Sequence, residues 1–598
     1  MSGSIKKREE IAPEYKWKLE DIYSDEAQWE ADFEKIKSLS AEVEKYQGRI
    51  GDSAGEMLAL FKLSEQVERL SETLYVYARM RRDENNANPR YQTLVDRIET
   101  LGVQISAATS FITPELNAIP QETVQSYMDS NDELKIYRHM FNELWRQKEH
   151  ILSLEEEKLL AMSADLSHAS GNIFTMLNNA DIKFPLIKDE EGKDIEITKG
   201  RYGRLMENQD RRVRQEAFEG LYSSYTKLKN TLAATLAASV KKDVFYARAR
   251  KYPSALTGSL DSDNITPEVY NSLIDTVHAK MDYMYRYMKL RKKILGVDEL
   301  HMYDIYVPLV KEYQAETPYK KACEMVINGL QPLGGQYLDL LRSGIAAGWV
   351  DVYENEGKTS GAYSWGAYDT HPYVLMNYDN KLDDAFTLAH ELGHSLHSYY
   401  SHKEQPHVYS QYPIILAEVA STVNESLLID YLLQNPVSRE EKLYLLNHYL
   451  EQFRATVYRQ TMFAEFEKIT HETVEAGDAL TPESLCQIYR DLNALYYGTD
   501  VVLDPQIEME WARIPHFYSA FYVYKYATGF SAATALKEQI LKEGEPAVKR
   551  YMKFLGSGGS DYPIAILQEA GVDLGKPQPV AAALDYFGRL VEEMEAII

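Results

Sequence analysis

Residues 390 to 394 carry two histidines and a glutamate at a spacing that can build a metal site. His390 and His394 are four residues apart, so on a helix their imidazoles project from one face and can reach the same ion. Glu391 follows the first histidine, where its carboxylate can activate a zinc-bound water without binding the metal itself. This His-Glu-x-x-His pattern indicates a zinc-dependent hydrolase.

A catalytic zinc site needs a third protein ligand, with the fourth position left open for water. A second helical pattern runs from Ile414 to Leu428, and Glu418 lies on its largely apolar first turns. An unpaired carboxylate is costly to bury there, and a metal ion removes that cost. We therefore expect His390, His394 and Glu418 to bind one Zn²⁺ per chain.

Two further residues of this helix pair bear on the site. Glu425 lies seven residues after Glu418 and returns to the same helical face, where it can accept the spare N–H of a ligating histidine. A plain solvated glutamate is the alternative for Glu425. Gly393 weakens the first helix but lets the second approach it closely.

The elements that must position these residues are mostly helical. From about Asp25 to Glu157, apolar residues recur at steps of three and four, and long helical patterns resume after Arg204. The zinc motif lies in a helical segment that Asp379 or Asn380 can cap. The sequence thus predicts a mainly α fold, a large helical body with a zinc-binding helix pair.

Between Ala180 and Thr198 the pattern changes from helical to alternating. Apolar residues lie on both sides of Glu191-Gly192, which predicts a small hairpin. We take this hairpin as the boundary between an N-terminal helical region, residues 1–200, and a zinc-peptidase region, residues 201–598.

A second break runs from Gly344 to Tyr378 and predicts a small β region beside the active site. Within it, residues 373 to 378 form a strand candidate directly before the zinc motif. Such a strand either pairs with an extended peptide at a sheet edge or belongs to an ordinary core hairpin. We expect His371 and Tyr373 to contact the substrate.

Composition excludes several classes of partner. Asp and Glu outnumber Lys and Arg by 91 to 65, and a formal charge of -26 repels a phosphate backbone, so we expect no nucleic acid. The two cysteines, Cys323 and Cys486, are too far apart in sequence to indicate a disulfide framework or a thiolate metal site.

The same sequence predicts no membrane association and a cytoplasmic protein. The longest weakly polar run, residues 231 to 240, is too short to cross a bilayer. The start of the chain shows no apolar segment of a secretory signal. The sequence leaves the oligomeric state open.

The chain resembles oligoendopeptidase F in the thimet-oligopeptidase family of zinc peptidases. The resemblance covers nearly the whole chain and includes the zinc helix. It also includes the segment from Tyr15 to Tyr23, Glu418 in its Ala-Glu-Val-Ala-Ser-Thr-x-Asn-Glu setting, and the segment from His516 to Gly529. It implies a mainly helical body with a deep channel between two halves that admits short peptides.

The resemblance also implies that a histidine and the tyrosines after it contact the substrate and the tetrahedral oxyanion. His516 matches directly, and we assign the tyrosine role to Tyr522 and Tyr524, with Tyr518 and Tyr526 as alternatives. Some of these aromatic residues also fit a buried core stripe.

The predicted function is that of a zinc-dependent endopeptidase hydrolysing internal bonds of short oligopeptides. An exopeptidase with the same metal chemistry is the nearest alternative. A helical peptide-binding scaffold without turnover is the second, and the intact pattern of His390, Glu391, His394 and Glu418 argues against it.

Overall fold

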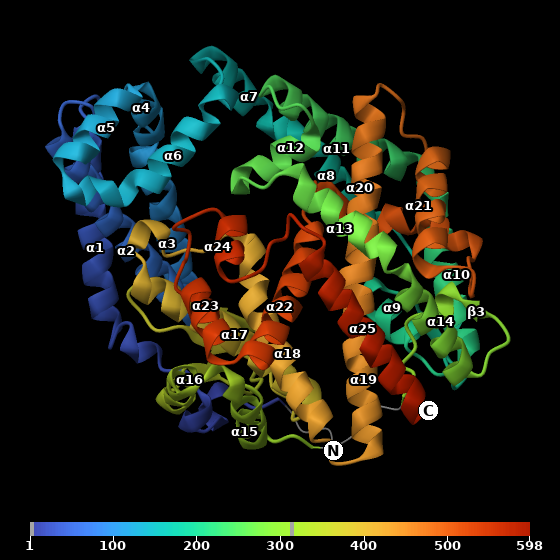
Figure 1. The fold of residues 1–598 in the computed structure, drawn as a ribbon. Helices are drawn as coiled ribbons and strands as arrows, with labels where there is room; N and C mark the ends of the chain where they lie inside the picture. The colour runs from blue at the N-terminus through green and yellow to red at the C-terminus, as the bar shows by residue number, and fades with distance from the viewer. Residues whose placement is uncertain (1–4, 311–315) are drawn as a thin grey trace. The chain divides into compact units, whose positions relative to one another are not determined.

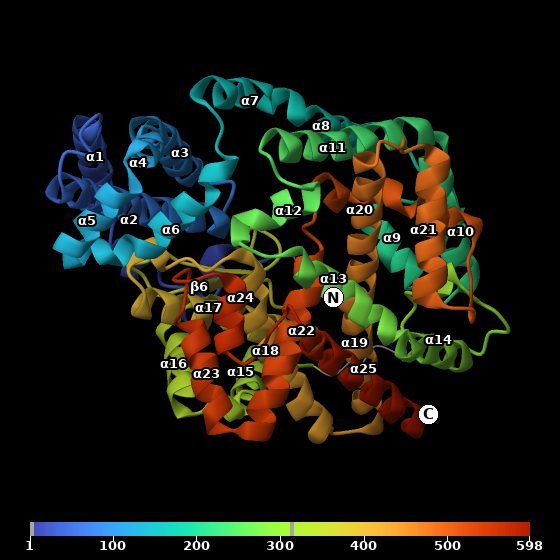
Figure 2. The same ribbon diagram turned by 45° about the horizontal axis from the view of Figure 1, so that its top comes forward.

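The computed structural model describes residues 5–310 and 316–598, which fold mainly into helices (Figures 1 and 2). The chain divides into two compact units, each assembled from three segments. Unit 1 comprises Met1–Lys148, Gln314–Tyr431 and Leu536–Gly571. Unit 2 comprises Glu149–Tyr313, Leu432–Ala535 and Val572–Ile598. The proposed sequence boundary at residue 200 falls inside unit 2, so the units divide the chain differently from the predicted regions.

Unit 1 combines an N-terminal helical layer with the helices that carry the zinc motif. Trp29, Leu60 and Val95 are fully buried where the first three helices pack together, as the three- and four-residue periodicity predicts. Its helices are α1 (Glu26–Val43), α2 (Ala54–Glu84), α3 (Pro89–Thr109), α4 (Ile112–Ala118), α5 (Gln121–Ser130), α6 (Arg138–Arg146), α15 (Tyr319–Gly329), α16 (Gly335–Ala347), α17 (Leu382–Glu404), α18 (Ile414–Gln434, which ends in unit 2), α23 (Glu545–Leu555) and α24 (Pro563–Glu569).

A small sheet in unit 1 packs against α17. Its strands are β4 (Val350–Asp351), β5 (Tyr363–Trp365) and β6 (Tyr373–Leu375), in the order β4-β6-β5. β6 pairs parallel with β4 and antiparallel with β5, so it is the central strand. Of the two predicted arrangements for this strand, the core one is therefore confirmed and the edge one is wrong.

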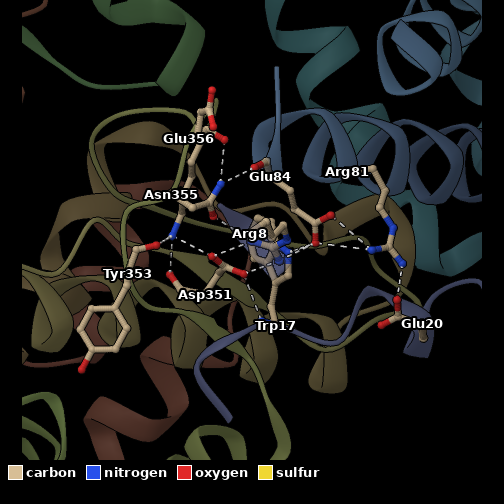
Figure 3. Close-up of polar contacts among 10 residues, drawn as sticks. Arg8, Trp17, Glu20, Arg81, Glu84, Asp351, Tyr353, Asn355 and Glu356 are labelled. Atoms are coloured by element: carbon tan, nitrogen blue, oxygen red, sulfur yellow. Dashed lines mark hydrogen bonds and ion pairs between the residues drawn. The ribbon is translucent and has the colours of Figure 1, made fainter. Parts of the chain in front are cut away.

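A buried ion cluster joins the N-terminal segment to this sheet (Figure 3). The Arg8 guanidinium lies 2.7 Å from Glu84 Oε1 and 2.6 Å from Asp351 Oδ2, and Lys358 Nζ lies 2.7 Å from Asp351 Oδ1. The Trp17 indole N–H donates to Glu84 at 2.7 Å. We call Arg8, Glu84, Asp351 and Lys358 the Arg8 cluster; each of its carboxylates has a cation supplied by the protein.

Unit 2 is a second helical body, and it contains the predicted hairpin. β1 (Leu186–Lys188) pairs antiparallel with β2 (Asp194–Glu196), and β3 (Leu300–His301) pairs parallel with β7 (Val501–Val502). Its helices are α7 (Leu154–Ser167), α8 (Ala169–Met176), α9 (Lys199–Met206), α10 (Arg211–Lys227), α11 (Lys229–Ala249), α12 (Ala255–Leu260), α13 (Pro267–Ala279), α14 (Met281–Leu295), α19 (Arg439–Phe453), α20 (Arg459–Glu475), α21 (Pro482–Tyr497), α22 (Tyr524–Glu543, which ends in unit 1) and α25 (Gln578–Ile597).

The structure bears on the predictions for the two cysteines and for membrane association. Cys323 is buried, Cys486 is partly buried, and neither forms a disulfide. Across residues 5–310 and 316–598, we find no helix that is both long enough and apolar enough to span a bilayer.

Candidate metal centre

Helix α17 holds both histidines of the zinc motif, as predicted. It begins at Leu382, and the Asp384 carboxylate accepts the backbone N–H groups of Asp379 and Lys381 at 2.8 and 2.9 Å. Asp379 or Asn380 was expected to cap the helix, and this is wrong, because the N-cap is Lys381. The Asp384 carboxylate, in the first turn of the helix, accepts the backbone N–H groups that would otherwise be left to solvent.

The absence of a side chain at Gly393 lets α18 approach α17. A Cβ built at Gly393 would lie 2.6 Å from the Ser421 Cα and 2.9 Å from the Ala420 carbonyl oxygen. Contacts this short with backbone atoms leave no room for any side chain. The predicted role of Gly393 in close helix packing is confirmed.

Buried hydrogen bonds fix how α18 lies against α17. The Asn424 amide donates to the Ala389 carbonyl at 3.1 Å, and the Tyr337 hydroxyl donates to Asn424 Oδ1 at 2.9 Å. Asn424 is fully buried, so both bonds are made away from water. We did not predict this role for Asn424; its sequence signal was a polar residue on a largely apolar helix, one position before Glu425.

Three ligand atoms from the two helices converge on one point. His390 Nε2 lies 3.1 Å from His394 Nε2 and 3.4 Å from Glu418 Oε2, and His394 Nε2 lies 3.6 Å from Glu418 Oε2. Within the described ranges this is the one group of at least three His, Cys, Asp or Glu residues that could hold a metal ion. We call these three residues the metal group.

The spacing of the metal group fits a tetrahedral zinc site. Ligand atoms about 2.0–2.1 Å from a tetrahedral ion lie about 3.3 Å from one another. The three separations within the group, 3.1, 3.4 and 3.6 Å, bracket that value. Two imidazole nitrogens and a carboxylate oxygen are also donors that zinc accepts.

Glu425 contacts the ring nitrogen of His390 that faces away from the metal group. Its Oε1 lies 2.5 Å from His390 Nδ1, the carboxylate–histidine contact that orients a metal-binding imidazole. Burial disfavours the charged ring, but the hydrogen bond and charge of Glu425 outweigh it and raise the pKa of His390 to about 9. A metal at Nε2 must displace the proton that this pKa favours.

Glu391 lies on the buried side of α17, beside the metal group. Its side chain is almost fully enclosed, and burial raises the pKa of its carboxyl above the ordinary value. A carboxyl group whose pKa moves toward neutrality suits proton transfer near neutral pH. The Glu418 carboxylate differs, because the adjacent His394 imidazole lowers its pKa to about 2 and keeps it ionised.

The two substrate residues expected before the zinc motif are placed differently. Tyr373 is 0% exposed and its hydroxyl donates to the Lys18 carbonyl, so it belongs to the core of unit 1. The predicted contact of Tyr373 with peptide is therefore wrong for this conformation. His371 is partly exposed and its ring stacks on Trp349, with Asp21 3.4 Å from its Nε2.

His516 and the tyrosines after it lie in unit 2. His516 and Tyr522 are both partly exposed, with nearly parallel rings and centroids 6.3 Å apart, and Tyr526 packs across both rings. In the part of the chain that the structure describes, no hydrogen bond engages the His516 ring or the Tyr522 hydroxyl. These two polar groups are therefore free to bind a ligand.

The other tyrosines of this segment are less suited to that role. Tyr524 is 0% exposed, so its predicted contact with substrate is wrong for this conformation. The Tyr518 hydroxyl lies 2.9 Å from Thr235 Oγ1, and its ring stacks on Phe174. Tyr522, in contrast, combines a partly exposed ring with a hydroxyl that has no hydrogen bond among the described residues.

Comparison with known proteins gives the family. The sequence profile of Peptidase family M3 matches residues 204–586, and that of Oligopeptidase F matches residues 115–184. The chain is 46% identical over 597 residues to Oligopeptidase PepF of Bacillus subtilis, covering 100% of this chain and 89% of that protein. The chain belongs to peptidase family M3. It is a peptidase of the oligopeptidase F type, and its reaction is the hydrolysis of peptide bonds.

Other members of the family support the same assignment. An oligoendopeptidase F homolog of Lactococcus lactis is 40% identical, with 99% of each chain covered. The crystal structure of oligoendopeptidase-F from Enterococcus faecium has a TM-score of 0.74 at 36% identity, covering 96% of this chain and 99% of that one. A Chlamydophila abortus crystal structure assigned as a peptidase superposes with a TM-score of 0.94 at 35% identity over 100% of both chains. The mainly α fold of this M3 peptidase thus agrees with its solved relatives.

Proposed function

We propose that this M3 peptidase is a zinc-dependent endopeptidase that cuts internal bonds of short oligopeptides. His390, His394 and Glu418 are the zinc ligands, Glu391 is the general base, and Glu425 orients His390. The observation that carries the proposal is the convergence of three ligand atoms within 3.6 Å of one another. We also retain the prediction of a cytoplasmic enzyme.

Zinc, when bound, supplies a Lewis acid that polarises a carbonyl oxygen and lowers the pKa of water from about 15.7 toward 7. The protein supplies the rest. Glu391 takes a proton from the attacking water and delivers it to the leaving amine. Glu425 holds the His390 ring through Nδ1, which leaves Nε2 directed at the rest of the metal group.

His516 and Tyr522 are proposed to donate hydrogen bonds to the oxyanion. Their polar groups are unengaged, and burial lowers the pKa of His516, which favours its neutral form. Removing one donor of this type costs about 10²–10³-fold in kcat in comparable enzymes. The chain offers a matched test, because Tyr524 lies two residues away but is fully buried.

The first experiment tests the reaction and its metal. A quenched peptide blocked at both termini is incubated with the enzyme, and the products are identified by mass spectrometry. We expect internal cuts that a chelator abolishes and added zinc restores. Complete resistance of the blocked peptide would indicate an exopeptidase, and cleavage unaffected by metal removal would exclude the zinc mechanism.

The second experiment tests the oxyanion donors. We expect Tyr522→Phe to lower kcat by about 10²-fold with little change in KM. Tyr524→Phe loses only a buried hydroxyl, so its kcat should stay close to that of the wild type. Equal effects of the two substitutions would remove Tyr522 from the proposed mechanism.

A further inference from the structure

The backbone at Phe521 is held in a conformation that bulky residues avoid. Its φ is 56°, in the left-handed region, where the other described non-glycine residues are Lys251, Asn264 and Asn380. An aromatic side chain pays a cost of about 1–2 kcal/mol in this region, and such strain persists only where the surroundings impose it. Phe521 lies between η14 (Pro515–Tyr518), which carries His516, and α22.

A buried glutamate in α20 holds this residue. Glu467 Oε1 accepts the Phe521 backbone N–H at 3.0 Å, and Glu467 is 1% exposed. Its second oxygen, Oε2, is buried without a hydrogen-bond partner. In the described ranges no ion pair joins Glu467 to a lysine, arginine or histidine.

Burying a carboxyl group with one unpaired oxygen lowers the stability of the fold. A contribution to stability therefore does not explain why Glu467 lies at this position. The groups around Glu467 are Asp243 from α11, Tyr270 from α13 and His471 from α20 itself. Burial and the charge of Asp243 raise the pKa of Glu467 well above its ordinary value, which favours the neutral acid. Its one described side-chain bond is the bond to Phe521.

Further contacts fix the same loop from other sides. The Phe521 ring packs on His471, with centroids 4.4 Å apart, and on Tyr270 at 5.7 Å. The Ser259 hydroxyl donates to the Ala520 carbonyl at 3.1 Å. Phe521 is thereby directed into the core, and the next residue, Tyr522, remains partly exposed with its ring parallel to His516.

We propose that Glu467 is a positioning residue: its hydrogen bond to the strained Phe521 amide sets the loop that presents Tyr522 beside His516. The proposal rests on the proposed function of these two residues as oxyanion donors. Glu467 itself is buried and acts through the loop. A misplacement of about 1 Å in a catalytic group can cost about 10²-fold in rate, so a bond that fixes the loop has a measurable effect.

The test compares two substitutions at Glu467. Glu467→Gln keeps an oxygen that accepts the Phe521 N–H, whereas Glu467→Met has a similar length and no acceptor. Thr470→Val is the matched control, because the buried Thr470 hydroxyl donates only to carbonyls of its own helix. If Glu467→Met does not yield folded protein, Glu467→Asp replaces it, since it keeps the acid but withdraws it from Phe521.

Hydrogen exchange of the segment 518–523 reports on the loop independently of activity. We expect exchange about tenfold faster or more in Glu467→Met, and rates close to wild type in Glu467→Gln and Thr470→Val. Unchanged exchange in Glu467→Met, with the fold intact, would overturn the proposal.

Kinetics then test the link to Tyr522. We expect Glu467→Met to lower kcat about tenfold or more with little change in KM, and Glu467→Gln to retain activity. Adding Glu467→Met to Tyr522→Phe should lower kcat little further, because both act through one hydroxyl. Fully additive losses would overturn the positioning role. Faster exchange with wild-type kcat in both Glu467→Met and Tyr522→Phe would instead refute the proposed function of Tyr522 and leave the loop contact standing.

Discussion

The metal group and the Arg8 cluster are two collections of ionisable side chains in unit 1 that differ in how their charges are balanced. In the Arg8 cluster, Glu84 and Asp351 are matched by cations of the protein at 2.6–2.7 Å (Figure 3). In the metal group, three atoms that can bind a metal face one another, and the described residues place no lysine or arginine against them.

The difference separates a structural from a functional use of similar residues. A buried carboxylate with a protein cation holds segments together, whereas two imidazoles and a carboxylate that converge without a lysine or arginine can bind a metal ion from solution. We therefore expect substitutions in the Arg8 cluster to change stability and those around the metal group to change metal binding or turnover.

The largest expected effect is that of Glu391→Gln on turnover. The variant loses the proposed general base but none of the metal group, so we expect kcat to fall by about 10²–10⁴-fold while zinc content is unchanged. Steady-state kinetics and elemental analysis measure the two quantities. Glu404→Gln, at the exposed end of the same helix, is the control and should behave as wild type. Substantial turnover by Glu391→Gln would exclude it as the base.

Arg8→Met tests whether the Arg8 cluster contributes to stability rather than to metal binding. It removes the cation that Glu84 and Asp351 share, while Arg81 still pairs with Glu84 at 3.3 Å and Lys358 with Asp351 at 2.7 Å. We therefore expect a loss of about 1–3 kcal/mol in the free energy of unfolding. Denaturant unfolding followed by tryptophan fluorescence measures the free energy of unfolding. We expect the zinc content and kcat of the folded variant to equal those of the wild type. Arg49→Met, which removes an exposed pair with Glu56, should cost at most about 1 kcal/mol. A large loss of zinc from Arg8→Met would break the distinction between the two regions.

Glu425→Gln should weaken zinc binding without abolishing it. The carboxylate that orients His390 is lost, and partners of this kind contribute about 10–100-fold to metal affinity. A competition titration with a zinc chelator measures the affinity, and excess zinc should restore most of the activity. Wild-type affinity in this variant would show that the contact at Nδ1 has no bearing on the metal.

Gly393→Ala should have an effect of similar size, on helix packing rather than on a metal contact. Its Cβ would lie 2.6 Å from the Ser421 backbone, so α18 must shift at a cost of about 1–3 kcal/mol, and Glu418 moves with it. Thermal unfolding and the zinc titration measure both consequences. Gly102→Ala in α3, where nothing lies within 4 Å of the new Cβ, should be stabilising by about 0.5–1 kcal/mol. Equal results for the two glycines would contradict the close-packing argument.

The helical fold and the geometry of the metal group could be predicted from sequence because both rest on local periodicity. His390 and His394 share a face through a spacing of four, and Glu418 was identified as a carboxylate on an apolar helix. Asn424 was missed because its role depends on how two helices cross, which periodicity within one helix does not determine.

The errors have a related physical origin. Whether the strand of Tyr373 lies at an edge or in the centre depends on pairing with β4, which is distant in sequence. Tyr524 was chosen from the family resemblance by its spacing after His516. That spacing does not show that the left-handed backbone at Phe521 and the start of α22 at Tyr524 turn the Tyr524 side chain inward. A bond from Glu467, more than fifty residues earlier, holds that loop and leaves no local signal.

The most direct test of the account is anomalous diffraction at the zinc edge from crystals of the purified enzyme. We predict one peak per chain within about 2.0–2.2 Å of His390 Nε2, His394 Nε2 and a Glu418 carboxylate oxygen. A zinc peak bound elsewhere, or one that Glu418 does not contact, would contradict the proposed metal centre.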